Sequence, residues 1–282
     1  MLEHQNIVIF GATGTLGSHF RQHASALGAN CIAVGRRTTE KVTPDFRCDV
    51  TVLDDVLETT EKIYAQLPRV DTVINFTGVH HPPMDFCKQD PKKLAEDFLR
   101  VMNVNTTGAF YLTLAFAKQM VARRHGHIIH LCSDGSRLSL YGSYAYNSSK
   151  HAVEGLVKTA AAQLAPFNVR VNGVAPGTVE TPLNRHLLRS EDGQHYSPRA
   201  VSILAHTPTK KFSTLDGISE TIGAMCLPQR HFTGNVVFCD DGYNIEGHSW
   251  PLGNQALFKG EQALQALFQD LSKEYPIEPA KS

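Results

Sequence analysis

The chain has 282 residues, of which 42% are apolar and 19% are charged, as is ordinary for a globular protein with a full core. Its 27 lysines and arginines equal its 27 aspartates and glutamates, so the formal net charge is zero. A neutral chain offers no electrostatic case for binding nucleic acid or an anionic membrane surface. The sequence also has no run of about 18 apolar residues that could span a bilayer. We therefore expect a small-molecule partner.

The N-terminal residues and the cysteines both predict a cytoplasmic location. The first residues enter an apolar segment without the basic start and long apolar stretch of a signal peptide. The six cysteines are scattered and form no CxxC pair. Most of them lie in or beside apolar runs, where reduced thiols behave as small hydrophobes.

Short β-branched runs alternate with helix-length stretches along most of the chain. The predicted strands are Asn6–Phe10, Asn30–Val34, Asp71–Phe76, His127–Cys132, Val169–Val174 and Asn235–Cys239. The predicted helices include Leu16–Leu27, Thr51–Leu67, Thr106–Arg124 and Tyr144–Ala165. The strands are almost continuously apolar, which is typical of strands covered on both faces. This order predicts an α/β fold, a doubly wound parallel sheet of the Rossmann type in a single domain.

Two regions interrupt this alternation. Thr181–Lys211 shows no clear period, and an irregular segment of that length is usually functional or mobile, so we predict a substrate loop at 181–211. The tail after Gly247 carries an apolar stripe at helical spacing that packs either on its own domain or on a partner subunit. We thus expect a dinucleotide-binding and catalytic domain at 1–247 and a C-terminal extension with a short helix at 248–282.

A glycine-rich turn follows the first predicted strand directly and opens a helix. It reads Gly11-Ala-Thr-Gly14-Thr-Leu-Gly17. Glycine lets the backbone turn sharply and approach a pyrophosphate, while the helix N-terminus offers free N–H groups and a favourable dipole. Such turns also occur as plain structural corners, but the position after strand one favours a dinucleotide site.

The end of the second predicted strand indicates which dinucleotide is bound. In this fold class the strand end reaches the adenosine ribose, where an acidic residue would bond the 2′-hydroxyl and repel a 2′-phosphate. The chain instead has Gly35 followed by Arg36 and Arg37. Forked guanidinium donors suit a phosphate dianion, although two arginines can also be a solvated surface pair. We expect the cofactor to be NADP(H).

Tyr146 and Lys150 form the only Tyr-xxx-Lys pair in the chain. At i and i+4 near a helix start, both side chains share one face. A free tyrosine has a pKa of about 10, and a neighbouring ammonium, helped by a nicotinamide cation, is expected to lower it. Ser133 lies at the end of the strand His127–Cys132, and such strand ends line the ligand crevice of doubly wound sheets.

With these motifs the sequence resembles the short-chain dehydrogenase/reductase family over roughly Asn6–Gly247, and it is closer to the shorter oligomeric branch despite the atypical GxxGxxG spacing. By this resemblance the expected catalytic residues are Asn105, Ser133, Tyr146 and Lys150. The expected cofactor-binding residues are Gly11, Thr13, Gly14, Thr15, Leu16, Gly17, Arg36, Arg37, Asp49, Val50, Asn75, Gly78, Tyr146, Lys150, Pro176, Gly177, Val179 and Thr181. Phe76 and Thr77 stand where the family's Asn-Asn-Ala-Gly segment has an asparagine and an alanine. We therefore expect the hydrogen bonding around Asn75 to differ from the family's pattern.

The resemblance implies hydride transfer between nicotinamide and a carbonyl or secondary alcohol carbon. Tyr146 would act as general acid/base and Ser133 would position the substrate oxygen. Lys150 would bind the nicotinamide ribose, and Asn105 would hold a water that links Lys150 to solvent. A homodimer or homotetramer is expected. Alternatives are an epimerase or dehydratase with transient redox chemistry, and a non-catalytic NADP(H)-sensing regulator.

Several conspicuous residues are not assigned to the site. Adjacent His80 and His81 are interpreted as solvated loop residues, with substrate contact as the alternative, and no carboxylate stands at metal-ligand spacing from them. His127 and His130 point to opposite faces of their strand, so they cannot form one metal site. Cys132 is interpreted as a core thiol. No metal is expected.

Overall fold

The computed structural model describes residues 2–40, 42–81, 86–138, 142–181, 184–190, 193, 195–228 and 231–245. The predicted extension at 248–282 lies outside the described residues. The chain divides into two compact units. The larger unit consists of Met1–Val179 and Ser213–Cys239, and the smaller of Glu180–Phe212 and the residues from Asp240 on.

The larger unit is built on a seven-stranded sheet in which all neighbouring strands are parallel, in the order β3-β2-β1-β4-β5-β6-β7. The strands are β1 (Asn6–Phe10), β2 (Asn30–Gly35), β3 (Phe46–Arg47), β4 (Thr72–Asn75), β5 (Gly126–Leu131), β6 (Val169–Pro176) and β7 (Val236–Cys239). This arrangement confirms the predicted doubly wound Rossmann-type fold. The strand β3 was not predicted, because two residues carry no periodic pattern.

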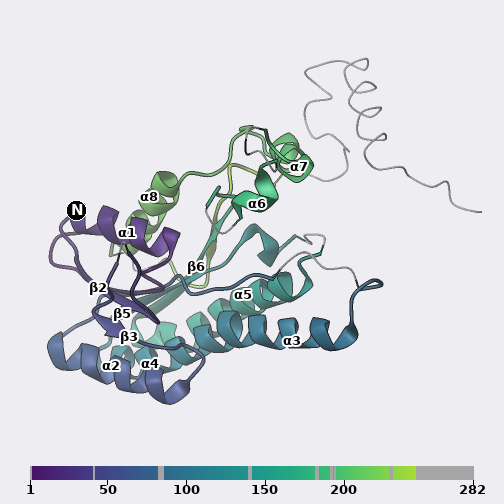
Figure 1. Cartoon of the computed structure of the whole chain (residues 1–282). Helices are drawn as coiled ribbons and strands as arrows, with labels where there is room; N and C mark the ends of the chain where they lie inside the picture. The colour runs from purple at the N-terminus through teal and green to yellow at the C-terminus, as the bar shows by residue number, and fades with distance from the viewer. Residues whose placement is uncertain are drawn as a thin grey trace, which may run out of the picture. The chain divides into compact units, whose positions relative to one another are not determined.

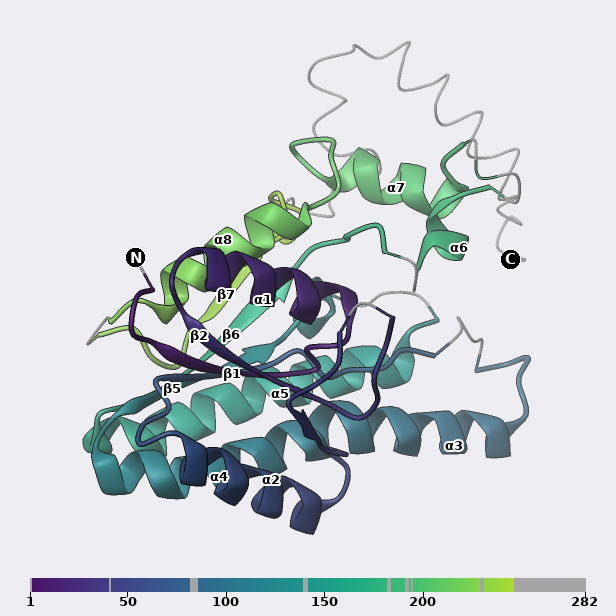
Figure 2. The same cartoon turned by 60° about the vertical axis from the view of Figure 1, so that its left-hand side comes forward.

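Helices cover both faces of the sheet (Figures 1 and 2). They are α1 (Thr15–Ala26), α2 (Leu53–Gln66), α3 (Pro91–Met102), α4 (Gly108–Arg123), α5 (Tyr144–Leu164) and α8 (Leu215–Cys226), with a π-helical turn at Asn103–Thr107. Both views place α1 and α8 on one face, and α2, α4 and α5 on the other, with α3 beside α5. Because all the strands are parallel, their carboxyl ends lie at one edge of the sheet, where ligands bind in such folds.

The core consists of one apolar layer on each face of the sheet. Val8 and Phe10 of β1 belong to the layer that contains Phe116 of α4. Ile7 and Ile9, the alternate residues of the same strand, belong to the layer that contains Phe20 of α1 and Ile222 of α8. Because both faces are buried, the strand is apolar at every position after Asn6, as its sequence indicated.

The segment expected to be an irregular loop at 181–211 contains helices, so that expectation was wrong for this part. The smaller unit holds α6 (Arg185–Leu188) and α7 (Pro198–His206). The N-cap of α7 is Ser197, whose Oγ accepts a hydrogen bond from the N–H of Ala200 at 3.2 Å. Helices of four and nine residues are too short for an apolar period to stand out in the sequence.

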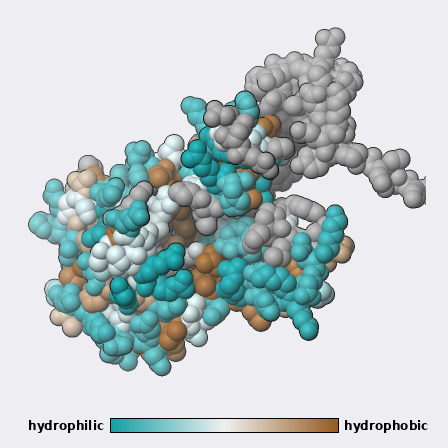
Figure 3. Space-filling model, in the orientation of Figure 1, coloured by the Kyte–Doolittle hydropathy of each residue, from teal (hydrophilic) through white to brown (hydrophobic). Residues whose placement is uncertain are grey.

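The surface agrees with the neutral, mixed composition. The face drawn in Figure 3 is mostly hydrophilic, with hydrophobic side chains gathered in small areas. Within the described residues, no helix combines the length and apolar character that crossing a membrane requires.

Candidate active site

The glycine turn after β1 has a backbone that tolerates no side chains at two of its positions. Gly11 has a φ of +74°, and a Cβ there would lie 2.9 Å from the backbone carbon of Phe76. A Cβ on Gly17 would lie 2.4 Å from the carbonyl oxygen of Gly11. Gly14 is the N-cap of α1 and supplies no side-chain cap. The N–H groups of the first helical turn, which begins with Thr15 and Leu16, therefore suit an anionic ligand.

A cavity of about 210 Å³ adjoins this turn. Its lining includes eight of the predicted cofactor residues, namely Gly11, Thr13, Gly14, Arg36, Arg37, Asp49, Val50 and Gly78. The loop residue Thr77, which was not predicted, also lines it. Adding a Cβ to Gly35 would bring it within 2.9 Å of the Thr13 side chain, so the base of the cavity is tightly packed. A glycine cradle beside a helix N-terminus and two arginines fits a phosphorylated dinucleotide.

Of the two arginines in the cavity lining, Arg36 lies beside Asp49. Its side chain is 68% exposed, and its Nη1 lies 3.7 Å from Oδ2 of Asp49. Asp49 is held by Thr51, whose N–H and hydroxyl both donate to Oδ1 at 3.0 and 2.7 Å. These bonds and, less strongly, Arg36 keep the pKa of Asp49 below its usual value. The long ion pair leaves the guanidinium largely available to a phosphate.

The hydrogen bonding around Asn75 is complete despite the sequence departures. Thr77 donates to Asn75 Oδ1 through its N–H, at 2.9 Å, and through its hydroxyl. On the other side Asn75 Nδ2 lies 3.4 Å from His130 Nδ1, and His130 Nε2 lies 2.8 Å from the Thr113 hydroxyl. Since that hydroxyl donates to the Ala109 carbonyl, His130 Nε2 must donate and Nδ1 must accept. Burial lowers the pKa of His130 to about 4, so this neutral form persists.

Tyr146 and Lys150 lie in the first turns of α5, as their spacing predicted. Lys150 Nζ is 5.5 Å from the centre of the Tyr146 ring and donates to the Leu131 carbonyl at 2.7 Å. Lys150 is 2% exposed, and burial lowers its pKa to about 8. A Cβ on Gly78 would lie 3.8 Å from Nζ, so the ammonium also faces the loop after β4.

The expected lowering of the tyrosine pKa is not produced by the chain's own residues. Burial raises the pKa of Tyr146 to about 12, and the hydrogen bond with Ser133 opposes this only in part. The nearby Asp134 carboxylate raises it further. The prediction considered the Lys150 charge and left out the desolvation of the phenol, which is the larger effect here.

Ser133 follows β5 directly, where the sequence placed it. Its hydroxyl donates to Asp134 Oδ1 at 2.7 Å and accepts from the N–H of Gly135 at 3.1 Å. Both Ser133 and Asp134 are buried. Asp134 was missed in the sequence analysis, although a carboxylate directly after the predicted catalytic serine was a visible signal.

Asn105 lies in the π-helical turn between α3 and α4, a geometry that is frequent at functional sites. Its Oδ1 accepts from the N–H of Val79 at 2.8 Å, and its Nδ2 donates to the Val79 carbonyl at 3.0 Å. Nδ2 also donates to the Ser149 hydroxyl at 2.9 Å. Asn105 therefore ties the loop after β4 to the helix that carries Tyr146 and Lys150.

The remaining predicted cofactor residues follow β6. Pro176 ends that strand, and the N–H of Gly177 donates to the Cys239 carbonyl at 3.2 Å. Val179 is buried in the larger unit. Thr181 belongs to the smaller unit, where its N–H and hydroxyl donate to Asn184 Oδ1 at 2.8 and 3.1 Å. Its role at the cofactor stays a prediction.

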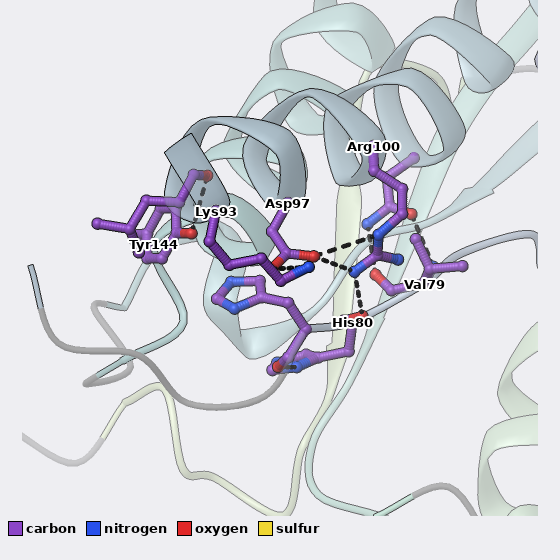
Figure 4. Close-up of polar contacts among 9 residues, drawn as sticks. Val79, His80, Lys93, Asp97, Arg100 and Tyr144 are labelled. Atoms are coloured by element: carbon purple, nitrogen blue, oxygen red, sulfur yellow. Dashed lines mark hydrogen bonds and ion pairs between the residues drawn. The ribbon is translucent and has the colours of Figure 1, made fainter. Parts of the chain in front are cut away.

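His80 and His81 are not solvated loop residues, so that interpretation was wrong. His81 is 2% exposed and His80 is half-buried. The His80 ring lies 4.5 Å from the Tyr146 ring, and the His81 ring lies 4.7 Å from that of Tyr144, measured between centroids. Figure 4 shows the loop at His80 beside the polar side chains of α3. Sequence spacing could not predict these contacts because the rings belong to elements more than 60 residues apart.

Two expectations about other residues agree with the structure. Cys132 is buried, and burial raises the pKa of its thiol to about 12, as suits a core thiol rather than a nucleophile. His127 and His130 make separate contacts, with Asn172 and Thr113 respectively. Among the described residues no group of three or more His, Cys, Asp or Glu side chains could hold a metal ion.

Known proteins resemble this chain in sequence and in fold. Residues 5–192 match the family described as short chain dehydrogenase. The 3-oxoacyl-[acyl-carrier-protein] reductase FabG of Thermotoga maritima is 30% identical over 206 residues, which are 73% of this chain and 78% of that protein. The (+)-borneol dehydrogenase 2 of Salvia officinalis is 31% identical over 206 residues, which are 72% of each chain.

A solved structure shows the same fold. The gluconate 5-dehydrogenase from Burkholderia cenocepacia, in complex with NADP and tartrate, superimposes with a TM-score of 0.75 at 24% identity, covering 87% of this chain and 97% of that one. The family match, the two relatives and the nucleotide-binding sheet lead to one assignment. The chain belongs to the short-chain dehydrogenase/reductase family of oxidoreductases, which use a nicotinamide cofactor.

Proposed function

We propose that the protein is an NADP(H)-dependent oxidoreductase that interconverts a carbonyl compound and a secondary alcohol, with Tyr146 as general acid/base. The observation that carries the proposal is the meeting of Tyr146, Ser133 and Lys150 at the carboxyl ends of the strands, next to the glycine cradle. Both named relatives, a reductase and a dehydrogenase, act in this chemical class.

The nicotinamide, when bound, supplies or accepts the hydride. In the reductive direction the Tyr146 hydroxyl donates its proton to the substrate oxygen as negative charge develops there. Ser133 positions that oxygen by turning its hydroxyl hydrogen, which it donates to Asp134 Oδ1 here, towards the substrate, while Gly135 N–H holds its oxygen. A tyrosine with a pKa of about 12 is fully protonated near neutrality, so the chain's own residues prepare it as an acid. Lys150, held against the Leu131 carbonyl, binds the ribose and carries positive charge beside the phenol.

Tyr146→Phe tests this function. With a panel of ketones and aldehydes, the wild-type protein should oxidise NADPH, and the variant should lose about 10²–10⁴-fold in kcat because proton donation is removed. Cofactor affinity should fall far less than kcat, since the aromatic ring remains and only the hydroxyl is lost. An unchanged rate in the variant would refute the role of Tyr146. Substrate conversion without net cofactor oxidation would replace the proposal with an epimerase or dehydratase.

Arg36→Asp tests the preference for the 2′-phosphate. The variant should bind NADPH at least about tenfold more weakly and NADH nearly as well, because only NADPH loses a charge-assisted hydrogen bond. Lys62→Asp, on the exposed face of α2, makes the same charge change away from the cavity and should leave both affinities unchanged. Equal weakening of the two cofactors by Arg36→Asp would contradict the assignment.

We propose further that the protein forms a homodimer or homotetramer. Phe110 and Leu114, one turn apart on α4, are each 49% exposed, and an apolar pair on one helix face suits burial against a second copy. Light scattering should give a multiple of the 31.0 kDa chain mass. Phe110→Lys with Leu114→Lys should lower that mass.

A further inference from the structure

A fully buried imidazole lies beside the loop that follows β4, and the mechanism above does not use it. His130 of β5 is 0% exposed, and the register of the sheet pairs it with Asn75, the last residue of β4. The loop that follows Asn75 lines the cavity beside the glycine turn. A buried histidine is costly unless its ring nitrogens are bonded, so the partners of His130 indicate what the residue does.

Two independent contacts assign the same hydrogen to the His130 ring. The Thr113 hydroxyl gives its single hydrogen to the Ala109 carbonyl at 2.8 Å, so His130 Nε2, which lies 2.8 Å from that hydroxyl, must donate. The N–H of Thr77 only donates, so its partner on Asn75, at 2.9 Å, is Oδ1. Asn75 Nδ2 therefore faces His130 Nδ1, at 3.4 Å, and this nitrogen must accept. A neutral ring with its hydrogen on Nε2 satisfies both contacts.

The last member of this hydrogen-bond chain belongs to the cavity. Thr77 lines the cavity and bonds Asn75 Oδ1 through both its N–H and its hydroxyl. A Cβ added to Gly11 would lie 2.9 Å from the backbone nitrogen of Thr77, so Thr77 packs directly against the glycine turn. The position of Thr77 therefore sets the shape of the cavity beside the turn.

The other half of the loop is held by different residues. Asn105 bonds both the N–H and the carbonyl of Val79, at 2.8 and 3.0 Å. Arg100 Nη2 reaches the carbonyl oxygen of His80 at 3.4 Å, as Figure 4 shows. The catalytic side of the loop thus has anchors of its own, so loss of the His130 bonds acts on the cofactor side.

We propose that His130 is a positioning residue for the cofactor, which acts through Asn75 to hold Thr77 against the glycine turn and so preorganises the cavity for the dinucleotide. Preorganisation raises affinity because the cavity wall need not be ordered when the ligand binds. The effect applies equally to NADPH and NADH, since both carry the pyrophosphate that the turn suits. This inference rests on the family's nicotinamide cofactor and not on the reaction proposed above.

Two substitutions of nearly equal size isolate the bond between His130 and Asn75. His130→Leu removes both nitrogens, whereas His130→Asn places an amide oxygen near the position of Nδ1, where it can accept from Asn75. In fluorescence titrations His130→Leu should bind NADPH and NADH each about tenfold more weakly, the size of one good hydrogen bond. His130→Asn should bind both within about threefold of the wild type. His130→Phe, which keeps the volume of the ring, takes the place of His130→Leu if that variant does not fold.

His127→Leu is the matched control for the loss of a buried imidazole. His127 is 1% exposed near the amino end of the same strand, and its Nε2 lies 2.9 Å from Asn172 Nδ2. This variant should lose stability in urea denaturation as His130→Leu does, because a buried partner is left without its bond. It should bind both cofactors as the wild type does.

A measurement on the wild-type protein tests the direction of the bonds. Proton–nitrogen correlation spectra of protein labelled with ¹⁵N-histidine report which ring nitrogen carries the hydrogen, and the His130 signal is identified by its absence from His130→Asn. The hydrogen should lie on Nε2 alone even at about pH 6, where an ordinary histidine is mostly protonated. A hydrogen on Nδ1 would overturn the proposal.

The binding results separate this inference from the proposed function. Wild-type affinity in His130→Leu, equal weakening in His127→Leu, or no recovery in His130→Asn would overturn the positioning role and leave the oxidoreductase function standing. Failure of the wild type to bind either NADPH or NADH would overturn both.

Discussion

Both ends of the parallel sheet carry a cavity with polar side chains in its lining. The two ends differ in the partners that these side chains have within the fold. The cavity at the amino ends, of about 240 Å³, is lined by Asp71, His125, His127 and Arg170, among other residues. The cavity of about 210 Å³ at the carboxyl ends adjoins the glycine turn. Cavity size therefore does not identify the active site.

At the amino end, charges are matched by partners within the fold. Asp71 accepts from the N–H of Asn6 at 2.8 Å, from Arg69 Nε at 2.7 Å and from His125 Nε2 at 2.8 Å. At the carboxyl end, burial raises the pKa of Tyr146 to about 12 and lowers that of Lys150 to about 8. Burial also lowers the pKa of His127 at the amino end, but that ring bonds Asn172. What marks the carboxyl end as a site for chemistry is that two displaced titrating groups lie together beside the glycine turn.

Gly17→Ala should produce the largest change at the carboxyl end. The added Cβ would lie 2.4 Å from the Gly11 carbonyl oxygen, so the turn must shift away from the geometry that suits a pyrophosphate. We expect cofactor affinity to fall by about 100-fold, equivalent to roughly 3 kcal/mol. Fluorescence titration with NADPH measures this. Gly155→Ala, where a Cβ would meet nothing within 4 Å, is the matched control and should bind normally.

Lys150→Met should reveal the buried ammonium in a pH titration of stability. The folded-state pKa of about 8 lies below the usual 10.5, so the folded protein disfavours the proton and the cost is greatest below pH 8. Between pH 8 and 10 the free energy of unfolding of the wild type should rise by about 2 kcal/mol relative to the variant. Urea denaturation at several pH values checks this. A difference that does not change with pH would contradict the lowered pKa.

Asp71→Asn should have the smallest effect on function and should act on stability alone. Replacing the carboxylate weakens its bonds to Arg69 and His125, which we expect to cost about 1–3 kcal/mol of unfolding free energy. The kcat and the affinity for NADPH should stay at wild-type values, because these bonds lie at the amino ends of the strands. A marked loss of activity in a folded variant would show that the two ends are coupled.

The features that the sequence could predict are those that depend on local patterns. The glycine turn and the Tyr146–Lys150 spacing are local patterns, and the structure places them as expected, as it does Ser133 at the end of β5. The core strands were predicted within two residues at their ends, since both faces of the sheet are apolar.

What the sequence could not predict depends on contacts between distant elements. The contact between the His80 and Tyr146 rings joins a loop after β4 to α5, and no local pattern reports such a contact. The direction of the Tyr146 pKa shift depends on burial, which only the folded chain determines. Thr77 is a third case, because its two bonds to Asn75 compensate a departure that looked disruptive in the sequence.

Transfer of a labelled hydride from NADPH to the substrate shows whether the protein performs the proposed reduction. The full-length protein is incubated with 2-hydroxycyclohexanone and with cyclohexanone in the presence of NADPH deuterated at the transferable position of C4, and the products are examined by mass spectrometry and NMR. We expect one deuterium on the carbinol carbon of the alcohol and an equal amount of NADP⁺, both lost in Tyr146→Phe. An alcohol without deuterium on that carbon, or no alcohol at all, would contradict the proposed reduction.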